Sequence, residues 1–190
     1  MSKLFFSRGD VASRLAGLDS PKHKDSLASR IAGKTPAEEM GQRLDNANAV
    51  IAALRKSGVS SFFAAEHAKL FINPESAVRE RGLIVSEFEV AHGLSAKQAA
   101  KMADCVIFTA AKGTDFSQVG RIKTMASVAL GEGVPFTSVA DATYYAPVSV
   151  TPEDFARRCV ATALKQGKPL DVSEVFLSTH IIAGLVAAGY

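Results

Sequence analysis

One stretch, residues 103–141, constrains the fold of this chain more than any other. It contains a nearly unbroken apolar run at residues 105–110, rich in β-branched and aromatic side chains, and a second apolar run at residues 134–139. Such runs are typical of strands that helices cover on both faces. A glycine-containing loop and a helical pattern separate the two runs. The order strand, loop, helix, strand is the smallest unit of a parallel α/β sheet.

The helix inside this unit has a recognisable start and end. Asp115 or Ser117 can accept a hydrogen bond from a free amide of the first turn, and Gln118 follows Asp115 at the spacing of a capping box. Gly131 and Gly133 end the pattern, because glycine readily adopts the left-handed conformation of a helix end. Apolar residues recur between these limits at helical spacing: Val119, Ile122, Met125, Ala126, Ala129 and Leu130.

The chain of 190 residues, 47% hydrophobic and 22% charged, has the size and composition of one folded globular domain. We predict an α/β fold, with a three-layer, Rossmann-like domain and a small, mainly parallel sheet at residues 36–190, and a basic helical extension at residues 1–35. No apolar run approaches the ~20 residues that span a bilayer, and the charged N-terminus lacks the apolar core of a cleaved signal peptide. Cys105 and Cys159 fall at predicted core positions, so we expect free buried thiols and a cytoplasmic location.

Other elements follow from capping signals and apolar patterns. A capping box and a proline predict a helix at residues 36–56, and the capping box of Ser95 with Gln98 predicts another at residues 96–102. The apolar run at residues 83–90 is typical of a strand. Residues 60–73 leave two alternatives open, a strand or a helix that buries the phenylalanines.

The two ends of the chain differ in character from its middle. Residues 1–35 hold seven basic and three acidic residues, a balance of +4, which leaves −1 for the rest of a chain whose net charge is +3. Helix-like pieces at residues 10–18 and 25–32 are too short to be stable alone. The last helix is apolar all round at residues 181–188, so it either docks into the body or forms a self-association surface.

Polar residues follow the two central predicted strands, at the edge where open parallel sheets bind ligands. Amides at the start of the helix could bind an anion such as phosphate, and Asp115 or Asp141 could accept a ribose hydroxyl or act as a general base. In the alternative, Asp115 and Ser117 are helix caps and Asp141 is a turn residue. The predicted ligand-binding residues are Lys112, Gly113, Thr114, Asp115, Ser117, Asp141, Thr143 and Tyr144.

The outline of this segment resembles that of the nucleoside deoxyribosyltransferase family. In that family an apolar strand led by Ala-Asp precedes an acidic, glycine-containing loop, a helix and a strand that starts with Gly-x-Pro. Residues 103–108, 113–117 and 133–135 follow this outline. The family's nucleophilic glutamate falls in the helix, where this chain has no acid at residues 120–123, so no catalytic residue carries over.

The sequence leaves two functions open. The first is binding of a nucleotide, nucleoside or sugar phosphate, with or without transferase or hydrolase activity. The alternative is a non-enzymatic interaction or assembly protein that self-associates or docks a partner through its N-terminal arm and apolar C-terminal helix. Nucleic acid is a disfavoured partner, because no recognition motif of aromatic and basic residues accompanies the arm. The histidine spacings predict no metal site, and no cofactor is indicated.

Overall fold

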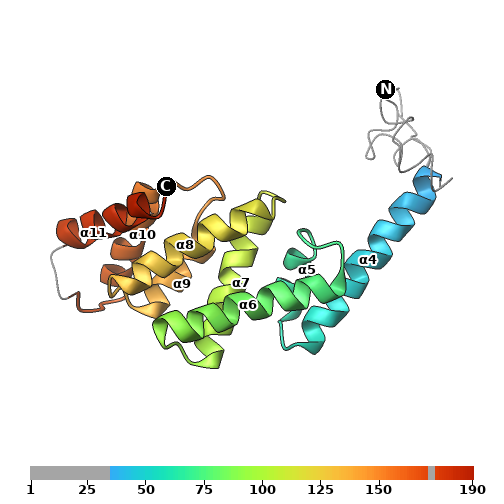
Figure 1. Ribbon diagram of the computed structural model, residues 1–190, viewed down its shortest axis with the longest axis horizontal. Coiled ribbons are helices and arrows are strands. Elements are labelled where there is room, and N and C mark those ends of the chain that lie inside the picture. The colour runs from blue at the N-terminus through green and yellow to red at the C-terminus, as the bar shows by residue number, and fades with distance from the viewer. Residues whose placement is uncertain (1–34, 171–173) are drawn as a thin grey trace, which may run out of the picture.

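The computed structural model describes residues 35–170 and 174–190, and this part of the chain consists of helices and their connections (Figure 1). No strand occurs in the described residues, so the predicted α/β, Rossmann-like domain with its parallel sheet is wrong. The helices predicted at residues 10–18 and 25–32 lie outside the described residues. In chain order the helices are α4 (Pro36–Lys56), α5 (Ser61–His67), α6 (Pro74–His92), α7 (Ala96–Ala111), α8 (Ser117–Gly131), α9 (Phe136–Tyr145), α10 (Pro152–Lys165) and α11 (Glu174–Ala187).

Each apolar run that the sequence pattern favoured as a strand belongs to a helix. Residues 105–110 lie in the second half of α7, residues 134–139 lead into α9, and residues 83–90 lie in α6. Every residue from 102 to 107 is buried. A helix that is covered on all sides has the same unbroken apolar sequence as a covered strand, and periodicity alone does not separate the two.

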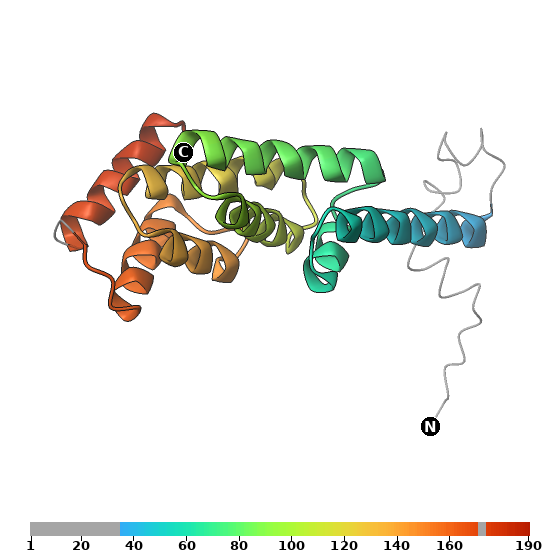
Figure 2. The ribbon, with the colours of Figure 1, turned by 90° about the horizontal axis from the view of Figure 1, so that it is seen from below.

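Helix α7 occupies the centre of the molecule. It packs against α5, α6, α8 and α9, and Figure 2 shows α6 on one side of it with α5, α9 and α10 on the other. Its start agrees with the prediction, because the amide and the hydroxyl of Ser95 both donate to Oε1 of Gln98. Ala99, Ala103 and Ala110 are fully buried and let the surrounding helices approach closely.

Helix α4 begins as predicted but buries only part of its apolar stripe. Thr35 accepts a bond from the Glu38 amide, and Glu38 closes the capping box on the Thr35 amide. The C-terminal half of α4 packs on α5 and α6 and buries Val50 and Leu54. The N-terminal half extends beyond the other helices, and there Leu44 is exposed (Figure 1).

The C-terminal helix α11 docks on α8 and α10, as in the first of the two alternatives for this apolar segment. Leu177, Ile181 and Leu185 are buried against the core. Close approach requires Gly184, because a Cβ at this position would lie 2.7 Å from Cγ1 of Val128 on α8. Within the described residues, no helix combines the length and the apolar character needed to cross a membrane.

This contact makes Gly184→Ala a destabilising change. Alanine raises helix propensity by about 1 kcal/mol, but the stiff Val128 side chain cannot move aside without an overpacking cost of about 1–3 kcal/mol. Chemical denaturation should show a net loss of up to about 2 kcal/mol, and Val128→Ala should convert the same change into a gain. Gly82→Ala in α6, where nothing lies within 4 Å of the added Cβ, is the control and should be stabilising. Equal effects at Gly82 and Gly184 would contradict the packing argument.

Candidate functional site

The predicted ligand-binding edge does not exist as a sheet edge, but two of its residues are neighbours. The Nζ of Lys112 donates to the carbonyl oxygens of Tyr144 at 2.6 Å and Ala146 at 2.8 Å, at the C-terminal end of α9. It also lies 4.8 Å from the ring centroid of Phe108. Burial lowers the pKa of Lys112. Lys112 therefore acts as a cap for carbonyl groups that the end of a helix leaves unpaired.

The acidic loop residue is a helix cap, as in the alternative given above. Asp115 accepts hydrogen bonds from the amide and hydroxyl of Ser117 and from the Gln118 side chain. These bonds hold the pKa of Asp115 below its usual value. Because Asp115 already occupies the Ser117 amide, this end of α8 does not present that donor to an anion. Thr114 takes a left-handed conformation, with φ of 53°.

The remaining predicted residues point to different neighbours. Asp141 accepts a bond of 2.7 Å from Nε2 of Gln166, the residue that follows α10. The Thr143 carbonyl accepts a buried bond of 2.6 Å from the Thr109 hydroxyl, while Oγ1 of Thr143 has no partner among the described residues. Gly113 lies against Val148, which leaves no room for a side chain. Lys112, Asp115 and Asp141 therefore make contacts that hold helix ends or join helices.

One buried polar cluster joins α5, α6 and α7. Arg81 of α6 makes a bidentate ion pair with Asp104 of α7, with contacts of 2.7 and 3.2 Å. Nε2 of buried His67 lies 3.2 Å from the Asp104 carbonyl oxygen. A carbonyl only accepts, so Nε2 carries the hydrogen, and Nδ1 has no partner among the described residues. Desolvation lowers the pKa of His67, so the ring is neutral at pH 7.

A serine and a histidine meet between α6 and α8. Nε2 of His92 lies 2.6 Å from Oγ of Ser127, which is the reach of a general base to a nucleophile. Ser127 lies inside α8, however, where backbone amides donate to carbonyl groups of the same helix. The Ser127 amide is therefore not a free donor that could stabilise an oxyanion, as the amides beside a catalytic serine do. We interpret the pair as a structural contact between two helices.

The thiol groups of the two cysteines are buried. Cys105 and Cys159 are free and buried, as predicted. Burial raises the pKa of the Cys105 thiol to about 12 and raises that of Cys159 as well, so neither forms a thiolate near neutral pH. Among the described residues, no group of three His, Cys, Asp or Glu side chains could hold a metal ion.

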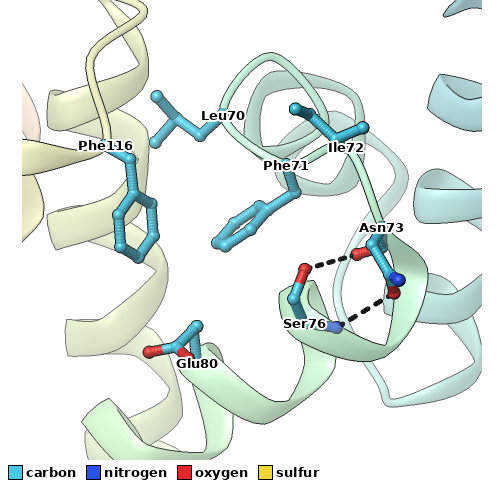
Figure 3. A pocket seen from close by; sticks show the side chains of 7 residues that line it. All are labelled: Leu70, Phe71, Ile72, Asn73, Ser76, Glu80 and Phe116. Atoms are coloured by element: carbon cyan, nitrogen blue, oxygen red, sulfur yellow. Dashed lines mark hydrogen bonds between the residues drawn. The ribbon is translucent and has the colours of Figure 1, made fainter.

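An apolar groove runs along α6 beside α8. It consists of two adjoining cavities of about 280 and 430 Å³, which share Glu80 and Phe116. Figure 3 shows the first cavity, where the rings of Phe71 and Phe116 face each other from the α5–α6 and α7–α8 connections. We call the two cavities together the α6/α8 groove. Its lining residues are Leu70, Phe71, Ile72, Asn73, Ser76, Glu80, Leu83, Ile84, Glu87, Phe116, Val119, Gly120 and Lys123.

The groove exposes large apolar side chains between charged ones. Ile72 is 82% exposed, Leu83 58% and Phe116 41%. Glu80 and Glu87 line the α6 side, and Lys123 of α8 pairs with Glu87 at 2.5 Å. An apolar floor with charged groups at its border is the arrangement that receives an amphipathic helix. The sequence pattern did not indicate this groove, because its walls come from segments that only the tertiary fold brings together.

A second exposed apolar surface lies on α5, α7 and α9. Its rings contact one another across the three helices, and the rings of Phe108 and Tyr144 stack with centroids 4.7 Å apart. We call it the aromatic face. It contains Phe62, Phe63, Phe108, Tyr144 and Tyr145.

Comparisons of the chain with protein-family models, with curated proteins and with solved structures find no match.

The capping role of Lys112 can be tested by Lys112→Met, which keeps the apolar stem and removes the ammonium donor. We expect a loss of about 1 kcal/mol in unfolding free energy, since the lost bonds involve a charged donor that is partly screened by solvent. Lys97→Met, at an exposed position near the start of α7, should change stability by less than about 0.5 kcal/mol. Equal effects of the two substitutions would rule out the cap.

His67 should make stability depend on pH. Its pKa is lowered in the folded state, so below the unfolded value of 6.5 the unfolded chain binds more protons and stability falls as pH falls. The slope from this residue is up to about 1.4 kcal/mol per pH unit. Urea titrations from pH 7.5 to 5 should give a flatter profile for His67→Gln than for the wild type. The same titration of His92→Gln serves as a comparison, because burial also lowers the pKa of His92 in the folded state. A profile unchanged by His67→Gln would contradict the assignment.

Proposed function

We propose that this chain is a non-enzymatic interaction protein whose α6/α8 groove binds an amphipathic helix of a partner protein. The observation that carries the proposal is the continuous apolar floor of the groove, which leaves Ile72, Leu83 and Phe116 in contact with water. A soluble protein gains free energy when such a surface is covered, at about 25 cal/mol for each Å² of apolar area removed from water.

The shape and chemistry of the groove support a helix as the bound element. Its α6 wall presents side chains at helical intervals, from Ser76 through Glu80 and Leu83 to Glu87. A helix lying beside α6 can place residues at i, i+4 and i+7 on the floor and its flanking residues beside the two glutamates. Glu87 pairs with Lys123 and Glu80 pairs with Arg79, so the charges at the border are balanced and the apolar floor is the part of the groove that favours binding.

The polar groups that could perform chemistry support a structural interpretation. Arg81, Asp104 and Lys112 are engaged in bonds that join helices. With the sheet edge absent, the small-molecule prediction loses the feature on which it rested. The free buried thiols support a cytoplasmic location for this interaction, because such thiols are typical of reducing compartments.

The groove can be tested with a library of amphipathic helical peptides selected against the full-length chain. Selected peptides should shift the backbone amide resonances of Ile84 and Val119, which line the groove. Leu83→Asp should weaken their binding at least tenfold, which corresponds to about 1.4 kcal/mol, because it places a charge against the apolar face of the peptide.

Val90→Asp is the matched control for this measurement. Val90 lies on the same helix and is 87% exposed, but it does not line the groove. We expect its peptide affinity to equal that of the wild type. Peptides that map to the aromatic face, or that lose affinity equally in both variants, would show that the binding surface lies elsewhere.

A further inference from the structure

The projecting half of α4 carries an apolar stripe that lies outside the core. Met40, Leu44 and Ala47 follow one another at i, i+4 and i+7, which places them on one face of the helix. Leu44 is 59% exposed, and none of the three belongs to the core of the described residues or packs against it. We call residues 36–48 of α4 the arm. Its stripe has the spacing that the α6/α8 groove accepts.

The stripe continues a contact that already exists in the fold. Further along the same face of α4, Ile51 packs against the core and Leu54 is buried in it, where α4 packs on α5 and α6. From Met40 to Leu54 the spacing alternates between four and three residues, which is the repeat of helices that pack side by side. The face of α4 that packs on other helices therefore extends into the arm.

The arm cannot reach the groove of its own molecule. Helix α4 is continuous over 21 residues, and the packing of its C-terminal half on α5 and α6 fixes the direction of the other half. The arm continues past the N-terminal end of α6 and points away from α8 (Figures 1 and 2). A second molecule is therefore needed to bring an arm and a groove together.

The charges of the arm are compatible with the groove. The glutamates at the border of the groove already have basic partners, so the border is electrically balanced. In helical projection at 100° per residue, Gly41 and Asn48 flank the stripe on one side and Arg43 flanks it on the other. Docking of the arm therefore brings apolar side chains together without opposing rows of like charge.

The positions of arm and groove allow two molecules to exchange this contact. Ile72, at one end of the groove, lies just before the start of α6. The arm leaves the body at the same end of α6 (Figure 2). A two-fold axis near this point can place each arm beside the groove of the other molecule. Such an interface is closed, because each molecule uses its own arm and its own groove once.

The exchange also increases the buried area toward that of a stable dimer. Residues 36–48 form a helix about 20 Å long and, with side chains, about 10 Å wide, so one contact has a small footprint. Specific interfaces bury at least about 1,000 Å² in total. An exchanged dimer makes the contact twice. It covers Leu44 of the arm and the exposed groove residues Ile72, Leu83 and Phe116 in both molecules.

We propose that the chain forms a two-fold homodimer in which the arm of each molecule occupies the α6/α8 groove of the other. This inference rests on the proposed function of the groove, and it names a second copy of the chain as the partner that supplies the amphipathic helix.

Sedimentation velocity of the full-length chain and its variants tests the dimer. The wild type should sediment as a dimer at the concentrations used for NMR. Leu44→Asp should weaken association about a hundredfold, because each of the two contacts loses about tenfold. Ala49→Asp, at an exposed position on the opposite side of α4, is the matched control and should dimerise like the wild type. A monomeric wild type overturns the inference, and so does equal association of the two variants.

Substitutions in the groove identify the surface that receives the arm. Leu83→Asp should weaken association as much as Leu44→Asp does, whereas Val90→Asp, outside the groove, should leave association unchanged. Normal dimerisation of Leu83→Asp would mean that the arms pack on each other or on another surface, and it overturns the inference. Open head-to-tail assemblies in place of a dimer overturn it as well.

Mixing of labelled chains locates the contact directly. Asp45→Cys carries a nitroxide on a side of α4 away from the stripe, whereas Cys105 and Cys159 are buried and do not react under native conditions. These chains, prepared without ¹⁵N, are mixed with ¹⁵N-labelled chains that carry no spin label. The amide resonances of Ile84 and Val119 in the groove should broaden. Unchanged resonances in the groove contradict the proposed contact.

The selected amphipathic peptides separate this inference from the function on which it rests. When nine-tenths of the wild-type grooves are occupied by arms, the peptides should bind the Leu44→Asp chain about tenfold more tightly than the wild type. Equal affinity for the two chains would leave the groove as a binding site and overturn the arm as its occupant. Failure of every peptide to bind the Leu44→Asp chain would count against the groove itself.

Discussion

The burial of α7 on every side is the constraint on which the rest of the structure depends. A central helix with buried residues on all its faces requires other helices around it, and α5, α6, α8 and α9 provide that cover. The one carboxylate within its buried run, Asp104, is stable there because the Arg81 guanidinium pairs with it. The α6/α8 groove follows from the same arrangement, since α6 and α8 pack more extensively on α7 than on each other.

The sequence was informative about local structure and misleading about what the central apolar run becomes. The caps at Thr35 and Ser95 form as predicted, because each depends on residues within one turn. The run at residues 105–110 was interpreted as a strand from its β-branched and aromatic content. Burial overrides that propensity, since residues that favour strands also pack well in a helix that other helices enclose.

In the candidate site, too, contacts between residues close in sequence could be predicted, and contacts between distant segments could not. Lys112 and Tyr144 do come together, although they meet through capping of α9 and not at the ends of parallel strands. The cap at Asp115 could be foreseen from Ser117 and Gln118 beside it. The α6/α8 groove could not, because Ile72 and Lys123 are far apart in the sequence and a single sequence carries no record of which distant segments become neighbours.

The order of the helices along the chain also affects how the fold is reached. The most extensive contacts join helices that are close in sequence, such as α6 with α7 and α9 with α10. Contacts of this kind require little loop closure, and helical domains of low contact order fold within microseconds to milliseconds. The four helices that enclose α7 all lie between Ser61 and Tyr145. A chain emerging from the ribosome therefore presents the whole enclosure of its central helix before α10 and α11 have emerged.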